Sequence, residues 1–438
     1  MTRWISALAC WLCLMAPVQA TLTIEITEGV EDAEPIAVVP FGWQGQDAPA
    51  VDIAAIVSAD LRRSGRFRPM AEKDMLAKPT QTAQIRFKNW RIMDVPYLVI
   101  GQMREVGENS YQVEFRLFDV FRAKQLTGYR MPPVRRNQLR MIAHQISDAV
   151  YQEITGERGA FATRLAYIKK LPKQAEDPYR YLLFIADADT ENERPILRSR
   201  NPIFSPTWSP DGSKLAYAVA RSTGQSIYVF NLASKRIVQL TRPAEKFSAP
   251  AWSPDGRKMA MAKLENGSSD IFVMDLDSMQ KRRITRHWAI DTEPTWSPDG
   301  KSLVFTSDRG GSPQLYQYDF DTGKVKRLTF EGKQNLRASF SPDGRMICFV
   351  RMGEDGQHMI AVMDLENETT QVLSKRSQQE SWHESPTFAP NGSMIMYAAI
   401  WRGRNVLAAI SVDGRVHQRF SVKTGANVQE PAWSPFLD

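Results

Sequence analysis

Cysteine is scarce in this chain, which has 3 in 438 residues. Two of them, Cys10 and Cys13, lie in an apolar run near the N-terminus. If that run is removed, Cys348 stands alone and cannot form an internal disulfide. We therefore expect Cys348 to be a small buried hydrophobic residue, and the fold to be held by packing rather than by crosslinks.

Apolar runs of membrane-spanning length are missing as well. The run at residues 4–15 is too short to cross a bilayer as a helix, and it follows Arg3 and ends in small side chains at residues 16–20. Neither Cys10 nor Cys13 has the Leu three residues upstream that a lipoprotein signal would show. We expect residues 1–20 to be a cleaved signal peptide, and the mature chain to be exported and soluble, without membrane insertion.

Motifs that would indicate an enzyme or a metalloprotein are also absent. The sequence has no Gly-x-Ser-x-Gly, no Walker loop, no His-Glu-x-x-His and no pair of Cys-x-x-Cys motifs. Its 5 histidines are dispersed, and we expect His287 and His383 to be solvated or hydrogen-bonded. The run from Asp187 to Glu191 lacks the glycine and final carboxylate of a calcium loop, so it predicts a polar turn. We therefore predict no enzyme activity, no metal and no cofactor.

The charge distribution separates two parts of the N-terminal region. The overall net charge of +7 is spread through the chain, which argues against nucleic acid as a partner. Residues 21–61 contain 8 acidic residues and no Lys or Arg, whereas residues 62–160 contain 18 basic and 10 acidic residues. Either the two parts neutralise each other within one fold, or the acidic segment leaves the domain to meet a basic partner.

Residues 21–160 predict a small α/β domain. Alternating or β-branched apolar residues indicate strands at 21–27, 36–41, 97–101 and 111–120. Apolar residues at helical spacing indicate amphipathic helices at 51–61 and 137–155, the second of which ends at Gly156.

A repeated pentapeptide organises the rest of the chain. Trp-Ser-Pro-Asp-Gly begins at Trp208, Trp252 and Trp296, and the variant copies begin at Phe340, Phe388 and Trp433. The first four copies are 44 residues apart, a period typical of β-propeller blades with four short strands each. We expect Pro, Asp and Gly to form a tight turn, with Gly in the left-handed conformation, and the aromatic residue to fill the space between adjacent sheets.

The repeat count predicts a closed ring of six blades over residues 161–438. The three outer strands expected near residues 164–198 lack an innermost strand, and residues 427–433 provide an innermost strand without the rest. Together they complete one composite blade, so the C-terminal strand closes the ring. The predicted fold is an α/β N-terminal domain followed by an all-β six-bladed propeller.

The whole mature chain resembles the TolB family, periplasmic components of the Tol–Pal system of Gram-negative bacteria. Besides the pentapeptide, four segments are similar to that family: residues 38–41 (VVPF), 99–102 (VIGQ), 159–167 (GAFATRLAY) and 431–435 (PAWSP). The chain departs from the family pattern in two places. It has Phe in place of Trp at the fourth and fifth copies, and it has four extra residues between those copies. These differences affect the shape of loops and not the fold.

The resemblance implies a periplasmic binding protein rather than an enzyme. In the family, one end of the propeller channel binds Pal, the peptidoglycan-associated lipoprotein, and the N-terminal strand binds TolA, which is anchored in the inner membrane. The two events are coupled, and the system maintains the outer membrane and draws it inward at division. We expect the free chain to be a monomer. The acidic segment coincides with the TolA-binding strand, and the residues implied are Thr21, Leu22, Thr23, Ile24, Glu25, Ile26, Glu28, Glu31, Asp32 and Glu34.

For the Pal surface we predict the residues just before each innermost strand, because these positions surround one mouth of the channel. They are Phe204, Ser205, Phe247, Ser248, Thr292, Glu293, Leu336, Arg337, Glu384 and Glu430. Because interfaces depend on a few anchors, Phe247, Thr292 and Glu293 are the foremost candidates among them.

Two other classes of function are weighed against this one. The chain could be an exported accessory domain of a prolyl-oligopeptidase-like peptidase, which the missing nucleophile motif disfavours. It could also be a sensor that binds a small ligand in the central channel.

Overall fold

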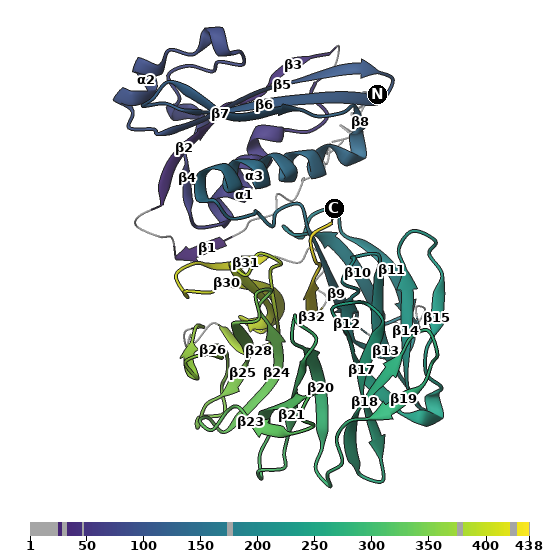
Figure 1. Ribbon diagram of the computed structural model, residues 1–438. Coiled ribbons are helices and arrows are strands. Elements are labelled where there is room, and N and C mark those ends of the chain that lie inside the picture. Colours follow the sequence, from purple (N-terminus) through teal and green to yellow (C-terminus); the bar gives the residue numbers. More distant parts are fainter. Residues whose placement is uncertain are drawn as a thin grey trace, which may run out of the picture.

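The computed structural model describes residues 25–28, 33–45, 48–172, 178–374, 380–420 and 427–437, with the backbone alone at 25–28. An N-terminal domain of mixed sheet and helices lies above a ring of β-sheets (Figure 1). No helix in these ranges is long and apolar enough to cross a bilayer. The expected signal peptide lies outside the described residues.

The N-terminal domain is built on a mixed sheet with the strand order β4-β2-β5-β6-β7. Strand β2 pairs in parallel with β4 and β5, and β5 and β6 form a long antiparallel hairpin. The short strands β3 and β8 pair with β5 and β6. The strands are β2 (Glu34–Val38), β3 (Gly42–Gln44), β4 (Phe67–Pro69), β5 (Tyr97–Gly107), β6 (Ser110–Asp119), β7 (Lys124–Arg130) and β8 (Val134–Arg135).

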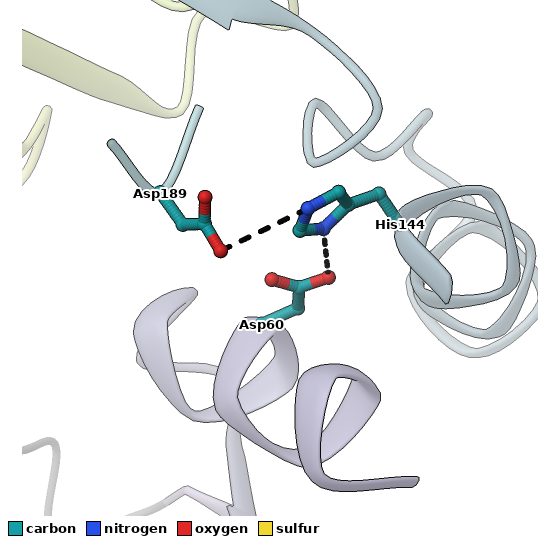
Figure 2. Close-up of side chains that lie close together, drawn as sticks. All are labelled: Asp60, His144 and Asp189. Atoms are coloured by element: carbon teal, nitrogen blue, oxygen red, sulfur yellow. Dashed lines mark hydrogen bonds and ion pairs between the residues drawn. The ribbon is translucent and has the colours of Figure 1, made fainter. Parts of the chain in front are cut away.

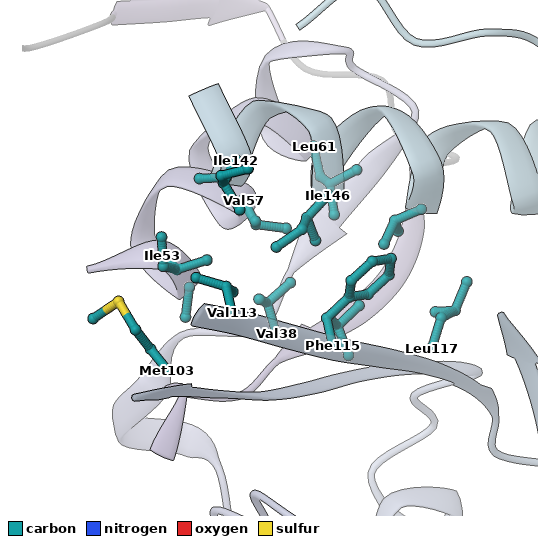
Figure 3. Close-up of a cluster of buried hydrophobic side chains, with 14 of the residues drawn as sticks. Val38, Ile53, Val57, Leu61, Met103, Val113, Phe115, Leu117, Ile142 and Ile146 are labelled. Atoms are coloured by element: carbon teal, nitrogen blue, oxygen red, sulfur yellow. The ribbon is translucent and has the colours of Figure 1, made fainter. Parts of the chain in front are cut away.

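Two helices, α1 (Ile53–Arg63) and α3 (Leu139–Thr155), cover one face of this sheet (Figure 3). Asp52 caps α1 by accepting a hydrogen bond from the Ala55 amide (2.9 Å), and Gly156 ends α3 with φ 78°. The apolar stripes of both helices bury Val57 and Ile146 against strand residues such as Val113 and Phe115. The predicted helices and the predicted β5–β6 pairing are confirmed.

The opposite face of the sheet is covered by a segment that the sequence pattern did not predict. Helix α2 (Phe87–Ile92) buries Trp90, which is 1% exposed, against Leu98 and Phe118. Its six residues are too few for a visible helical period, which explains the omission.

The propeller has six blades, and each blade is an antiparallel sheet of four propeller strands. We number the composite blade 1 and the others in chain order. Blade 1 comprises β32 (Asn427–Trp433), β9 (Arg164–Lys170), β10 (Tyr181–Asp187) and β11 (Arg194–Ser199). Blade 2 comprises β12 (Ile203–Trp208), β13 (Lys214–Arg221), β14 (Gly224–Asn231) and β15 (Ile237–Gln239), and blade 3 comprises β16 (Phe247–Trp252), β17 (Lys258–Glu265), β18 (Ser268–Asp275) and β19 (Lys281–Arg283). Blade 4 comprises β20 (Asp291–Trp296), β21 (Ser302–Ser307), β22 (Gln314–Asp319) and β23 (Val325–Arg327), and blade 5 comprises β24 (Gln334–Phe340), β25 (Met346–Met352), β26 (His358–Asp364) and β27 (Thr369–Val372). Blade 6 comprises β28 (Glu380–Phe388), β29 (Met394–Trp401), β30 (Arg404–Ser411) and β31 (His417–Phe420).

Ring closure occurs in blade 1, as the sequence predicts. The C-terminal strand β32 pairs with β9 along its length, from Asn427 opposite Lys170 to Trp433 opposite Leu165. Val428 is fully buried within the core shared by blades 1 and 6. The two ends of the propeller sequence are thus hydrogen-bonded to each other.

The pentapeptide turn is as expected, with one addition. The glycines have φ between 65° and 74°, for example Gly212 and Gly392. Ser209 also contributes, because its Oγ donates to Asp211 (2.5 Å) and accepts from the Lys214 amide (2.9 Å). The serine therefore ties the turn to the returning strand.

The aromatic residues lie between neighbouring blades, as the sequence predicts. The Trp208 indole donates to the Ala432 carbonyl of blade 1 (3.1 Å), and the Trp296 indole donates to the Ala251 carbonyl of blade 3 (3.2 Å). Each tryptophan thereby joins two blades by packing and by a hydrogen bond.

The pentapeptide turns face the N-terminal domain. Asn391, in the turn of blade 6, donates to the Arg158 carbonyl (3.0 Å), and Gln418 of β31 donates to the Arg63 carbonyl at the end of α1. Since each innermost strand ends at its turn, each begins at the opposite face. We call that opposite face the distal mouth.

The N-terminal strand β1 (Glu25–Glu28) lies on the outer edge of blade 6. It pairs antiparallel with β31, with Glu25 opposite Arg419 and Glu28 opposite His417. Blade 6 is thereby a five-stranded sheet. Within the acidic segment, β1 is therefore attached to the propeller, whereas Glu34 and the helix α1 belong to the N-terminal domain.

Candidate functional site: the channel and its distal mouth

Each innermost strand has one residue in a left-handed backbone conformation at the β-bulge nearest its pentapeptide, and β28 has a second, Trp382, farther from the pentapeptide. The six residues nearest the pentapeptides have φ between 47° and 54°, and each lies three positions before the aromatic residue of its repeat. All six line one cavity of about 320 Å³ along the propeller axis. They are Ser205, Ala249, Glu293, Arg337, Ser385 and Glu430.

Arg337 is the hub of a charge network across this channel. Its guanidinium contacts a Glu293 oxygen (Nε to Oε1, 3.0 Å), the Ser385 hydroxyl (Nη1 to Oγ, 2.7 Å) and a Glu430 oxygen (Nη1 to Oε1, 3.8 Å). Glu430 in turn accepts a hydrogen bond from the Ser205 amide. Five blades are therefore connected by polar contacts, and blade 3 contributes Ala249.

The network is acidic overall. Burial disfavours the charge of Arg337, but the carboxylates of Glu430, Glu293 and Glu384 outweigh that effect and raise its pKa. Burial raises the pKa of Glu430, and Arg337 opposes the rise. With one cation among three carboxylates, loss of Arg337 would leave like charges facing one another.

Arg337→Met is expected to lower the free energy of unfolding by about 1–3 kcal/mol, less than for a fully buried ion pair because channel water reaches the side chain. The loss should be larger at pH 8 than at pH 5, since Glu430 can take up a proton at the lower pH. Urea denaturation of the mature chain measures it, with Arg345→Met, an exposed arginine paired with Asp343, as control. Equal losses at the two pH values would contradict this account of the network.

The residues predicted for the mouth fall into two groups. Ser205, Glu293, Arg337 and Glu430 line the channel, and Glu384 contributes to its field. Phe204, Ser248, Thr292 and Leu336, each one position before a bulge, are half-buried.

The choice of Phe247 as an interface anchor is wrong. Its side chain is 1% exposed and packs against Ile227, Met261 and Met274. It also meets Phe272 edge to face at 5.5 Å. A side chain enclosed in this way between blades 2 and 3 stabilises the ring and is not available to a partner.

The sequence reasoning missed a set of exposed apolar residues slightly farther out on the distal mouth. They lie on the connections that lead into the innermost strands, at the beginning of β28, and on the hairpin between β17 and β18 of blade 3. Trp288 is 74% exposed, Phe330 69% and Trp382 50%. Leu264 and Ile290 are also exposed, and the two segments are joined by a bridge from Ser269 to Ile290. The sequence contained a signal for this surface, because an aromatic residue in a polar connection between strands has no core to pack into.

The remaining candidate residues take structural roles. His383 is buried and hydrogen-bonded to the Ser374 hydroxyl (2.8 Å), and Cys348 is fully buried, which raises the pKa of its thiol. The expectations for both residues are confirmed. The run from Asp187 to Glu191 is a turn closed by a bond from the Thr190 amide to the Asp187 carbonyl (2.8 Å), as predicted.

Among the described residues, one group of acidic and histidine side chains is compact enough to share a metal ion: Asp60, His144 and Asp189. Arg63 and Arg140 already bond the two carboxylates. In the structure the group is therefore part of a network of ion pairs.

The residues predicted for the second partner are only partly described. Thr21 to Ile24, Glu31 and Asp32 lie outside the described residues, and Glu25, Ile26 and Glu28 belong to β1. Glu34 differs from them, because it begins β2 and its amide donates to the Arg66 carbonyl (2.9 Å). A segment that leaves the blade as a unit ends before Glu34.

Comparison with known proteins gives one consistent result. The model of the TolB amino-terminal domain matches residues 22–126, and that of the TolB β-propeller domain matches residues 151–437. The Tol-Pal system protein TolB of Thioalkalivibrio sulfidiphilus is 56% identical over 100% of this chain and 99% of its own length. The protein of the same description from Nitrosococcus oceani is 54% identical over 98% of this chain and 97% of its own length. The crystal structure of TolB from Acinetobacter baumannii superposes with a TM-score of 0.84 at 37% identity, covering 95% of this chain and 100% of the other.

Proposed function

The chain belongs to the TolB family of Tol–Pal system proteins, and from this we propose that it is a non-catalytic periplasmic scaffold that links the outer-membrane lipoprotein Pal to inner-membrane-anchored TolA. In that role it maintains the integrity of the outer membrane and supports its invagination during cell division.

The observation that carries the proposal is the exposed apolar surface of the distal mouth. Trp288, Phe330 and Trp382 expose large side chains around the opening of a polar, charged channel. Tryptophan is enriched among the residues that dominate binding energy at protein interfaces. A rigid ring that presents aromatic anchors on one face fits a folded protein partner, which we assign as Pal.

The TolA site is the N-terminal segment. Strand β1 is the edge strand of blade 6 and pairs with β31 through its backbone. We infer that TolA pairs with β1 once this segment has left the blade. Any influence of Pal on that release must act reciprocally on Pal affinity, by typically about 1–3 kcal/mol.

Deletion of residues 21–31 is expected to abolish TolA binding and to leave Pal binding intact. The deletion removes β1 but retains β2, whose pairing with β4 and β5 holds the domain together. Calorimetric titration with each partner measures both affinities, and circular dichroism checks the fold.

Persistent TolA binding after this deletion would refute the assignment of the segment. Cleavage of peptides by the purified chain would favour the peptidase alternative instead. Binding of a small periplasmic solute that Arg337→Met abolishes would favour the sensor.

A further inference from the structure

A buried charge cluster joins the N-terminal domain to blade 1 (Figure 2). His144 of α3 bonds Asp60 of α1 through Nδ1 (2.7 Å to Oδ2). Its other ring nitrogen faces blade 1, where Nε2 lies 3.8 Å from an Asp189 oxygen and 3.9 Å from an Asp187 oxygen. The imidazole thus stands between carboxylates of two domains.

The imidazole at the centre of the cluster is shielded from water. His144 and Asp60 are fully buried, and Asp187 and Asp189 are 8% and 7% exposed. Nε2 of His144 has no hydrogen-bond partner, although it faces two carboxylates. A buried polar atom in this position requires an explanation.

The charges around the imidazole explain why Nε2 lies there without a hydrogen-bond partner. The carboxylates of Asp60, Asp187 and Asp189 face the imidazole, and two guanidinium groups share them: Arg63 bonds Asp60, while Arg140 bonds Asp189 and lies 3.7 Å from Asp187. These three anions and two cations leave one negative charge, and the charged groups next nearest to them, Asp148 and Arg164, are of opposite sign. A proton on His144 balances the remaining negative charge and places an N–H on the atom that lacks a partner.

We propose that His144 holds a proton that clamps the N-terminal domain onto blade 1, so that the closure of the two domains responds to pH. The clamp is a property of this interface alone and involves neither Pal nor TolA. Because β1 leads directly from blade 6 into the N-terminal domain, opening of the interface would move the segment that β31 holds.

The directions of the pKa shifts agree with this assignment. Burial opposes the charge of His144, but Asp60 and Asp189 outweigh it and raise its pKa. Burial also opposes ionisation of Asp60, yet His144 and Arg63 lower its pKa to about 2. A histidine whose pKa is raised by folding stabilises the folded chain fully at pH values below its pKa in the unfolded chain, about 6.5. This stabilisation is lost as the pH rises through the pKa that the histidine has in the folded chain. The clamp should therefore weaken as the pH rises above about 6.5 and through the raised pKa of His144 in the folded chain.

A second group titrates nearby and must be separated from His144. Burial raises the pKa of Asp148 on α3 to about 6, against hydrogen bonds from the amides of Phe161 and Ala162. Asp148→Asn removes that titration while leaving His144, Asp60 and Asp189 in place. It is the matched control for every pH series.

The first experiment measures the proton directly. In NMR spectra of the mature chain, His144 is the imidazole whose signals disappear in His144→Gln. We expect its titration midpoint above 6.5, and a shift of about one pH unit downward in Asp189→Asn. A His144 that is neutral throughout pH 5.5–9, or a midpoint that Asp189→Asn leaves unchanged, would overturn the proposal.

The second experiment measures domain closure. Spin labels at Glu105→Cys and Gln280→Cys, both on the exposed surface, report the distance between the domains, and the native Cys348 is buried. The distance distribution should broaden between pH 6 and pH 9 in the wild type and in Asp148→Asn. In His144→Gln it should be broad at every pH, with a circular dichroism spectrum like that of the wild type.

Two outcomes would overturn the proposal. One is a narrow distribution of the distance between the spin labels in His144→Gln. The other is one-to-one binding of added Zn²⁺, measured by calorimetry and lost in His144→Gln, which would make the cluster a metal site.

Discussion

Removing residues 427–438 is expected to destabilise the entire propeller rather than one end of it. The deletion takes away β32, the innermost strand of blade 1, which leaves β9 with an unpaired edge at the centre of the ring. It also removes the Ala432 carbonyl that Trp208 bonds, and the Glu430 carboxylate of the channel network. Whole domains are stable by about 5–15 kcal/mol, and we expect this loss to reach a large part of that.

Thermal unfolding measured by circular dichroism tests this expectation. The matched control is the deletion of residues 21–31 at the opposite terminus, which removes one edge strand and should change the melting temperature by less than about 2 °C. The melting temperature of Val428→Ala should lie between those of the two deletion variants. The cavity that this substitution creates should lower the free energy of unfolding by about 1–3 kcal/mol. A truncated chain that melts with the wild type would show that blades 2 to 6 hold together without closure.

Trp382→Ala and Trp288→Ala are expected to weaken Pal binding by about 2–4 kcal/mol each, which is about 30-fold to 1,000-fold in affinity. Both side chains are at least half exposed at the distal mouth, and Trp382 stacks on His358 with 4.2 Å between ring centroids. Their removal creates no core cavity, so the melting temperature should stay close to that of the wild type.

Two control variants separate binding from stability. Phe121→Ala removes an aromatic side chain of similar exposure (51%) from the N-terminal domain and should leave Pal affinity unchanged. Phe247→Ala should cost about 3–5 kcal/mol of stability, because it empties a packed site between blades. If Phe121→Ala weakened binding as much as Trp382→Ala, the distal mouth would not be the Pal site.

The fold could be predicted because its determinants repeat along the chain. The spacing of Trp208, Trp252 and Trp296 sets the blade period, and the incomplete blades at the two ends predict closure by β32. The turn glycines need a left-handed conformation that few other residues adopt readily, so the pentapeptide specifies local geometry as well as period.

The site could be predicted only in part, because bulges and domain contacts leave no periodic trace. A regular strand alternates its faces, and a bulge next to Glu293 or Arg337 changes which side chain enters the channel. The prediction therefore named residues that line the channel, such as Glu293 and Arg337, but included Phe247, which faces the core. The turn around Asp189 looked like an ordinary polar turn, since its partners His144 and Arg140 are more than forty residues away in the sequence.

Affinity capture of binding partners from detergent-solubilised cell envelopes tests the central claim most directly. The bait is the mature chain, with Trp382→Ala and the 21–31 deletion as parallel baits. We predict that the wild type recovers both Pal and TolA, that Trp382→Ala loses most of the Pal, and that the deletion loses TolA alone. A wild-type bait that recovers no Pal would contradict the account.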